Sequence, residues 1–543
     1  MKTTWIPAIA LCALCVLAAP APADAMELKE FKRAFAATQN SWERRALVEQ
    51  LDPTDKKSRK ILYYVLTSPQ FDWYMRLGAI DVFMKCDDEK VIKELEKVKP
   101  SKKKDALKAE AIAVAFGKSG NIARAPWLIK ALKSKADLVR RAAAINMRFI
   151  RDKSMIGALI TAWQDEDKFT VWVHMLESLE KLTYQQGMPN SQDWADWWAV
   201  NEDAFDFEKA KAEAEKNKTE DKGILKTNIR GTNLTLRSRG SGLPLLVLPD
   251  YGFEQDYLET YLRNLEDTNQ ILYMRLPGTA DFTDPPLQNA PGAPQPYYPL
   301  ERISDAFEGL HKELVKQKKI KGKFAILAHG ISCWIAMKFA EKHPRAVRRV
   351  ILIGAHSGSK AAGEGIDRLV RTGQKQGDLE MEHYGLSRQF DGQKYNYVTK
   401  GDDERWALSR KSFTVRFGDR RNLEIGRLYG PINGVQKKVG EDRIAIVAKY
   451  QRPMGGCFIP EFSLFKLTKT PTPTMIMIGL GSIESSGEDA GAIAKFYGRY
   501  GKVAMFKRSG EMPFIEENEK FVETVRKWLG GKRKKKKKRK KRK

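Results

Sequence analysis

The chain has 543 residues and carries 96 Lys and Arg against 68 Asp and Glu, so its net charge is +28. This length is too great for a single hydrophobic core and predicts two or three domains. The composition is that of a soluble globular protein, and after the N-terminal segment no stretch is long and apolar enough to span a bilayer.

The N-terminus is predicted to be a targeting segment. An apolar run covers residues 5–19, and the sequence "APADA" follows with small residues at Ala23 and Ala25, where a signal peptidase would cut. We therefore expect residues 1–25 to be a signal peptide and the protein to be exported to a periplasmic, cell-envelope or extracellular location. An uncleaved membrane anchor is the alternative, although the run is shorter than the ~20 apolar residues of a spanning helix.

The cysteines predict neither a disulfide framework nor a metal site. Cys86, Cys333 and Cys457 remain after the signal segment, and an odd, sparse set does not support a disulfide-based fold. They are far apart, without a CxxC pair or a His/Cys cluster at metal spacing. We predict no structural metal and no cofactor.

The first helical domain is expected over residues 26–206. Small or apolar positions recur there at steps of 33, 32, 32 and 33 residues, namely Ala46, Ala79, Ala111, Ala143 and Leu176. The pattern resembles HEAT-type helical repeats, in which each helix pair buries its apolar face by stacking on the next pair. This resemblance implies an extended surface for a protein partner.

Aromatic residues end the helical domain. Trp194, Trp197 and Trp198 are predicted to cap the last repeat, with an aromatic ligand box as the alternative. A charged linker, helical or flexible, is expected over residues 207–222.

The pattern then changes to strands alternating with helices. The stretches "LPLLVLPDYGF" and "QILYMRLPGTADF" each read as a buried strand followed by a turn, and "FAILAHGISCWIAMKFAEKHP" reads as a strand, a sharp turn and a helix. Short apolar runs with intervening helices indicate a mostly parallel sheet covered on both faces.

These segments, in this order, resemble the α/β-hydrolase family over residues 223–530. "YGF" matches the oxyanion turn, "AHGIS" the nucleophile elbow, "TPTMIMIGLGS" the strand that presents the acid, and "RSGEMPFIEENEKF" the final loop. The stretch at about 359–469 lies where many family members insert a cap, which shapes access to the site. The fold class expected is therefore an all-α HEAT-like array followed by an α/β-hydrolase-type domain with an inserted cap.

The resemblance also locates the catalytic positions. Acyl transfer by this fold needs a serine at the elbow, a histidine to take its proton and a carboxylate to orient the histidine. The matching positions are Gly330 for the nucleophile, Ser482 for the acid and Glu511 for the histidine, and the oxyanion donors correspond to Phe253 and Ile331. Because all three catalytic roles are unfilled, we predict a domain without catalysis.

Two serines are alternative nucleophiles. Ser332 lies two residues after the elbow glycine, and Ser357 lies in "IGAHSGS", a turn that imitates an elbow. Cys333 is expected to be a buried packing thiol. His329 and His356 are expected near the carboxyl ends of central strands, where ligands gather in open α/β sheets, although a structural role is favoured for each.

The C-terminal residues 531–543 are predicted to form a disordered, polybasic tail, because a block of like charges repels itself and has no apolar residue to bury. Without its twelve charges the chain still carries +16. The tail is expected to bind an anionic surface or polymer through Lys532, Arg533, Lys534, Lys535, Lys536, Lys537, Lys538, Arg539, Lys540, Lys541, Arg542 and Lys543.

Two functions are compatible with these features. The favoured one is an exported, non-catalytic binding or scaffold protein, with a protein partner on the array and a small-molecule ligand possible in the hydrolase-like pocket. The alternative is an active hydrolase of esters, amides or peptides that uses Ser332 or Ser357. Binding of nucleic acid by the tail fits the charge but matches no folded motif.

Overall fold

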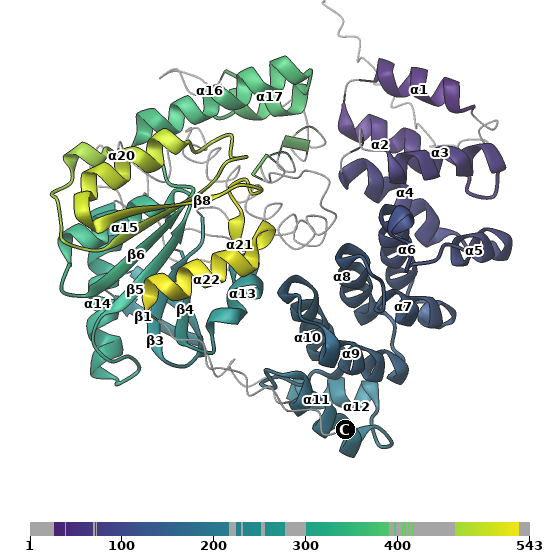
Figure 1. Ribbon diagram of the computed structural model, residues 1–543, viewed down its shortest axis with the longest axis horizontal. Coiled ribbons are helices and arrows are strands. Elements are labelled where there is room, and N and C mark those ends of the chain that lie inside the picture. The colour runs from purple at the N-terminus through teal and green to yellow at the C-terminus, as the bar shows by residue number, and fades with distance from the viewer. Residues whose placement is uncertain are drawn as a thin grey trace, which may run out of the picture.

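The structure is a computed structural model (Figure 1), and every structural statement below concerns the residues that it describes. These are residues 27–38, 40–68, 71, 73–216, 224–229, 232–250, 256–276, 300–389, 396–397, 404, 407–408, 411, 415–416 and 462–530. The predicted signal peptide, the polybasic tail and most of the predicted cap lie outside these residues.

The N-terminal part of the chain consists of stacked α-helices. They are α1 (Leu28–Ala37), α2 (Ser41–Glu49), α3 (Lys56–Thr67), α4 (Trp73–Lys85), α5 (Glu89–Glu96), α6 (Ala106–Lys118), α7 (Ala125–Ala131), α8 (Asp137–Asn146), α9 (Lys153–Asp165), α10 (Phe169–Thr183), α11 (Ser191–Asn201) and α12 (Phe207–Lys216). Helices α2, α4, α6, α8 and α10 pack on one another in turn, and Figure 1 shows them as one side of a curved stack.

The recurring positions found in the sequence lie on these five packed helices, but Ala46 on α2 is exposed, so its prediction as a core position is wrong. Ala79, Ala111, Ala143 and Leu176 are buried on α4, α6, α8 and α10. Small residues let neighbouring helices approach closely: a Cβ placed on Gly117 of α6 would lie 2.4 Å from the Cβ of Asn146. The spacing therefore corresponds to one helix pair, and the likeness to HEAT-type repeats stays a prediction.

Aromatic side chains close the end of the stack. Trp194 and Trp198 of α11 are buried, and the ring of Trp198 lies 5.4 Å from that of Phe205. Trp197 contacts both tryptophans. Helix α12, within the predicted linker, contacts α10 but buries no side chain fully.

The C-terminal part is built on an eight-stranded sheet. Its strands are β1 (Ile224–Ile229), β2 (Thr232–Gly240), β3 (Leu243–Leu248), β4 (Asn269–Arg275), β5 (Phe324–His329), β6 (Val347–Ile353), β7 (Thr474–Gly479) and β8 (Gly501–Phe506). The spatial order is β1-β2-β4-β3-β5-β6-β7-β8, with β1 and β2 antiparallel to their neighbours and the rest parallel. The predicted mostly parallel sheet is confirmed.

Helices cover both faces of this sheet. They are α13 (Asp256–Leu262), α14 (Leu300–Lys316), α15 (Ser332–Lys342), α20 (Gly487–Tyr497), α21 (Pro513–Glu516) and α22 (Asn518–Leu529). Helices α16 (Ser359–Gln376) and α17 (Leu379–Leu386) pack on each other in a separate apolar cluster. Helices α14, α15 and α20 pack in one apolar core, whereas α13, α21 and α22 pack in the core on the other face. This layering and strand order, with an antiparallel β2, are those of the α/β-hydrolase fold.

The helical array contacts the α/β part at both ends. The apolar core that holds α13 and α22 is continuous with that of the array, and α10 packs on both helices. At the other end, the Ser41 N–H at the start of α2 donates to Glu380 Oε1 on α17, at 2.8 Å. Helices α16 and α17 belong to the predicted cap, so the cap and the array touch. None of the helices that the structure describes is long and apolar enough to cross a membrane.

Candidate functional site

The turn after β5 has the geometry of a nucleophile elbow. β5 ends at His329, α15 begins at Ser332, and Gly330 between them has φ +58°. A side-chain-bearing residue is strained in this region of φ, whereas glycine adopts it freely. The strand, turn and helix predicted from "AHGIS" are all present, with a glycine at the centre.

The carboxylate of Asp250 fills the space in front of Gly330. A Cβ built on Gly330 would lie 2.2 Å from Asp250 Oδ1 and 2.3 Å from its Cγ. The N–H of Ile331, predicted as an oxyanion donor, donates instead to Asp250 Oδ1 at 2.9 Å. The start of α15 favours a negative charge at this point. An internal carboxylate therefore occupies both the nucleophile position and one oxyanion position.

An arginine from the predicted cap holds this carboxylate in place. The guanidinium of Arg416 pairs with Asp250 Oδ2, and its Nη1 lies 3.9 Å from Glu511 Oε2. The backbone carbonyl of Arg416 also accepts the Glu511 N–H at 2.6 Å. Burial alone would lower the pKa of Arg416, but the carboxylates around it raise the pKa well above its usual value. Arg416 is therefore charged and ties the cap to the ends of the strands.

The acid and histidine positions of the triad still lie next to each other. Ser482 Oγ donates to Glu511 Oε1 at 3.0 Å, and the Ser485 N–H reaches the same oxygen at 3.2 Å. Burial and the nearby Glu484 raise the pKa of the Glu511 carboxyl. The acid and histidine positions are therefore adjacent, but they hold a hydroxyl and a carboxyl group, with no imidazole to take a proton from a serine.

A second ion pair lies beside Glu511. Glu484 Oε2, in the segment after β7, is 2.9 Å from Nη1 of Arg388, which lies just after α17 in the predicted cap. Burial opposes ionisation of Glu484, but Arg388 and Arg416 lower its pKa to about 2. The carboxylates of Asp250 and Glu484 are thus paired with Arg416 and Arg388. These ion pairs stabilise the structure and do not provide a serine nucleophile.

His329 cannot serve as a general base toward the elbow. It is fully buried, its Nε2 lies 3.1 Å from the Glu511 carbonyl oxygen, and its Nδ1 lies 2.8 Å from the Tyr257 hydroxyl. Nε2 must carry the proton to donate to a carbonyl, so Tyr257 donates to Nδ1 while accepting the Asp250 N–H at 2.8 Å. Burial lowers the pKa of His329 to about 4. Both ring nitrogens are engaged, and the ring is neutral at pH 7.

The alternative nucleophiles are engaged elsewhere. Ser332 is buried, and its Oγ donates to the Pro249 carbonyl at 2.5 Å. Ser357 Oγ donates to Asp489 Oδ1 at 2.7 Å. Burial opposes ionisation of Asp489, but the nearby His356 and the hydrogen bonds from Ser357 lower the pKa of this carboxylate. A carboxylate of low pKa is a weak base, so neither serine is activated.

The remaining sequence candidates fit packing roles. Cys333 is buried with its Sγ 3.3 Å from the Ala328 carbonyl oxygen, and burial raises the pKa of the thiol. His356 Nδ1 lies 3.8 Å from Asp489 Oδ2, which is longer than a hydrogen bond. Phe253 lies outside the described residues. In the part of the chain that the structure describes, no group of three His, Cys, Asp or Glu side chains is placed to hold a metal ion.

Asp250 and Arg416 were not identified from the sequence. Asp250 directly precedes the predicted oxyanion turn in "LPDYGF". The signal in the sequence was therefore an acidic residue beside this turn, combined with a glycine at the centre of the elbow. Arg416 is 166 residues further along the chain, in a segment with no strong periodicity. Only the folded chain brings the two together.

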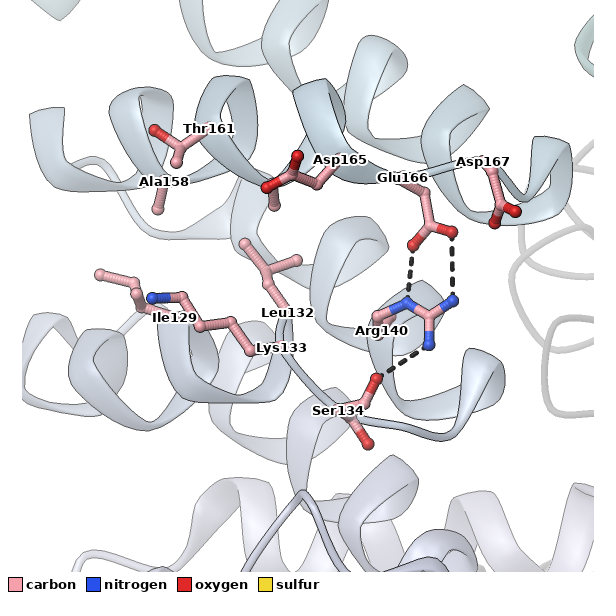
Figure 2. A pocket seen from close by; sticks show the side chains of 11 residues that line it. Ile129, Leu132, Lys133, Ser134, Arg140, Ala158, Thr161, Asp165, Glu166 and Asp167 are labelled. Atoms are coloured by element: carbon pink, nitrogen blue, oxygen red, sulfur yellow. Dashed lines mark hydrogen bonds and ion pairs between the residues drawn. The ribbon is translucent and has the colours of Figure 1, made fainter. Parts of the chain in front are cut away.

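A groove of about 600 Å³ lies on the array, between α7, α8 and α9 (Figure 2). Ile129, Leu132 and Ala158 contribute apolar surface to it. Arg140 Nε donates to Glu166 Oε2 at 2.6 Å, and Arg140 Nη1 donates to the Ser134 carbonyl at 2.8 Å. This cation and this anion therefore neutralise each other within the wall of the groove.

Comparisons with known proteins give structural neighbours only. No protein-family model matches the sequence, and no curated protein matches it. An esterase from Exiguobacterium antarcticum is 14% identical with a TM-score of 0.38, and the match covers 56% of this chain and 99% of the esterase. A meta-cleavage product hydrolase from Pseudomonas fluorescens is 15% identical with a TM-score of 0.40, over 56% of this chain and 97% of the hydrolase. A proline iminopeptidase-related protein from Thermus thermophilus is 16% identical with a TM-score of 0.39, over 56% and 96%. The fold assignment rests on the strand order and elbow described above.

Proposed function

We propose that the chain is an exported, non-catalytic binding or scaffold protein that joins a HEAT-like helical array to an α/β-hydrolase-like domain. The α/β domain is retained for its shape, and acyl transfer has been lost. The array presents a surface to a protein partner, the hydrolase-like pocket takes a small-molecule ligand, and the polybasic tail binds an anionic surface or polymer of the cell envelope.

One observation carries the loss of catalysis. The carboxylate of Asp250 stands where a serine side chain at Gly330 would be, with its charge held by the Ile331 N–H and Arg416. A carboxylate at that point repels the oxyanion of an acyl-transfer intermediate and takes one of its donors. Loss of a full serine triad removes about 10⁶ in rate on its own.

Ester turnover tests the absence of acyl transfer. The wild-type protein, with Ser332→Ala and Ser357→Ala as matched variants, is assayed against short-chain and long-chain nitrophenyl esters. We expect the three proteins to give the same background rate. Turnover by the wild type that is lost in either alanine variant, while circular dichroism shows both variants folded, would overturn the proposal.

Deletion of residues 531–543 tests the role of the tail. We expect the deletion to weaken binding to anionic vesicles at low ionic strength, because each basic residue near such a surface contributes about 1 kcal/mol before screening. Unchanged vesicle binding would remove the tail from the proposal and leave the account of the α/β domain intact.

A further inference from the structure

Among the side chains that the structure describes, seven exposed lysines lie along one edge of the array. They fall in the connections from α5 to α6 and from α7 to α8, with one more in the last turn of α7. We call them the basic ridge: Lys97, Lys99, Lys102, Lys104, Lys130, Lys133 and Lys135.

The two halves of the ridge form one continuous surface. Ser134 Oγ, between two ridge lysines, donates to the Pro100 carbonyl of the preceding connection at 2.6 Å. Trp127 Nε1 donates to the Val98 carbonyl at 3.2 Å, with its ring buried beneath the ridge. Figure 1 shows α5 and α7 on the same outer side of the stack. The 33-residue repeat thus places lysines of successive helix pairs next to one another.

The charge of the ridge is not neutralised within the molecule. Among the described residues, none of the seven lysines lies within ion-pair distance of a carboxylate. Arg140 nearby differs, because Glu166 binds it in the groove wall (Figure 2). The ridge ends at the next connection, where Asp165 and Asp167 are exposed on the far side of the groove.

The residue types favour a lipid surface as the partner. Lysines act as flexible point charges, and clusters of four to eight basic residues are typical of binding to anionic lipid headgroups. Recognition of single-stranded nucleic acid relies on exposed aromatic rings, whereas the aromatic ring at the ridge, Trp127, is buried. We propose that the basic ridge binds the surface of an anionic phospholipid bilayer.

The ridge and the tail would bind the same anionic surface, so this inference rests on the proposed function of the tail. Two attachment points on one chain raise the overall affinity, because the second contact forms within an already bound molecule. The ridge is tested in a protein that lacks residues 531–543, a deletion that removes no described helix or strand, so the ridge and the tail can fail independently.

The experiment measures sedimentation with vesicles of phosphatidylglycerol and phosphatidylcholine at low ionic strength. The tail-deleted protein is compared with its ridge variant, Lys99→Gln, Lys102→Gln, Lys133→Gln and Lys135→Gln. We expect the ridge variant to lose roughly tenfold or more in vesicle partitioning. The same four positions changed to arginine should keep the binding, and pure phosphatidylcholine vesicles should bind none of these proteins.

A matched control removes the same charge elsewhere. Lys316, Lys318, Lys319 and Lys321 are exposed around the end of α14, and their change to glutamine should reduce partitioning less than the ridge variant does. Equal losses in the two variants, or no loss in the ridge variant with an unchanged melting temperature, would overturn the proposal. A ridge variant that loses binding to duplex DNA but keeps binding to vesicles would also overturn it and would identify a nucleic acid as the partner.

Discussion

Gly330 and Asp250 depend on each other sterically. The carboxylate can approach the elbow because the glycine has no side chain, and the glycine is free of backbone strain at φ +58°. A serine introduced at position 330 would therefore not act as a nucleophile while Asp250 fills the space in front of it. The effect of changing either residue therefore depends on which residue occupies the other position.

A double-mutant cycle tests this coupling. We expect Gly330→Ala to destabilise the protein by roughly 1 to 3 kcal/mol more in the wild type than in the Asp250→Ala background, because the clash at 2.2 Å is then removed. Free energies of unfolding in urea measure the difference. Gly322→Ala is the control for backbone strain alone, since Gly322 also has positive φ but nothing within 4 Å of a Cβ. Strictly additive effects of the two substitutions would contradict the coupling.

His329 should make the protein sensitive to acid. Its pKa is about 4 in the folded protein, whereas an unperturbed histidine in the unfolded chain has a pKa of about 6.5, so on acidification the unfolded chain binds the proton first. This contribution to stability is present above pH 6.5 and is lost as the pH falls from about 6.5 to about 4, by roughly 3 kcal/mol. We expect His329→Gln to flatten the pH dependence of the unfolding free energy in this window. As a control, the change His311→Gln, at a partly exposed histidine, should leave the pH dependence of the unfolding free energy as steep as in the wild type. An unchanged slope in His329→Gln would show that His329 does not cause the acid sensitivity.

At the scale of elements, the helices and strands could be predicted because their apolar residues recur at regular spacing in the sequence. The 32- and 33-residue steps found the helices that pack in the array, and the apolar runs found the strands of the sheet. The elbow was recognisable because a strand, a glycine turn and an amphipathic helix follow one another locally. The contact between Arg416 and Asp250 has no such local signal, because the two residues are 166 positions apart in the sequence.

Gly117 should be essential to the packing of α6 on α8. A Cβ there would lie 2.4 Å from the Cβ of Asn146 and 2.5 Å from its carbonyl oxygen. We expect Gly117→Ala to lower the unfolding free energy by roughly 1 to 3 kcal/mol, although alanine is the better helix former. Gly491→Ala on the exposed face of α20 meets nothing within 4 Å and should stabilise the protein by up to about 1 kcal/mol. Stabilisation by both substitutions would show that α6 and α8 are not in close contact.

At the scale of the whole molecule, the array and the α/β part share one apolar core. Polar contacts reinforce the joint: Arg263 forms two hydrogen bonds to Glu180, at 3.2 and 3.0 Å, and Thr260 Oγ1 donates to Glu177 at 2.7 Å. Together with the contact between Ser41 and Glu380, these interactions attach the array to both the sheet and the cap. A partner bound to the array would thus contact a surface that is rigidly joined to the α/β part and its elbow.

Calorimetry tests this linkage. We expect the wild type to unfold in one transition, and Arg263→Ala to lower the stability by roughly 1 to 3 kcal/mol because Glu180 loses its partner in a largely buried joint. Arg151→Ala removes an exposed pair with Glu208 and should cost less than about 1 kcal/mol. Two separate transitions in the wild type would show that the array and the α/β part are independent.

The absence of an activated serine is best measured by the mass of the intact protein after exposure to a fluorophosphonate, which phosphonylates activated serines covalently. Because Asp250 fills the elbow and the hydroxyls of Ser332 and Ser357 are bonded to other groups, we predict no added mass after prolonged incubation, beside an active serine hydrolase that is fully labelled. Stoichiometric labelling that maps to Ser332 or Ser357 and disappears on its change to alanine would contradict the account.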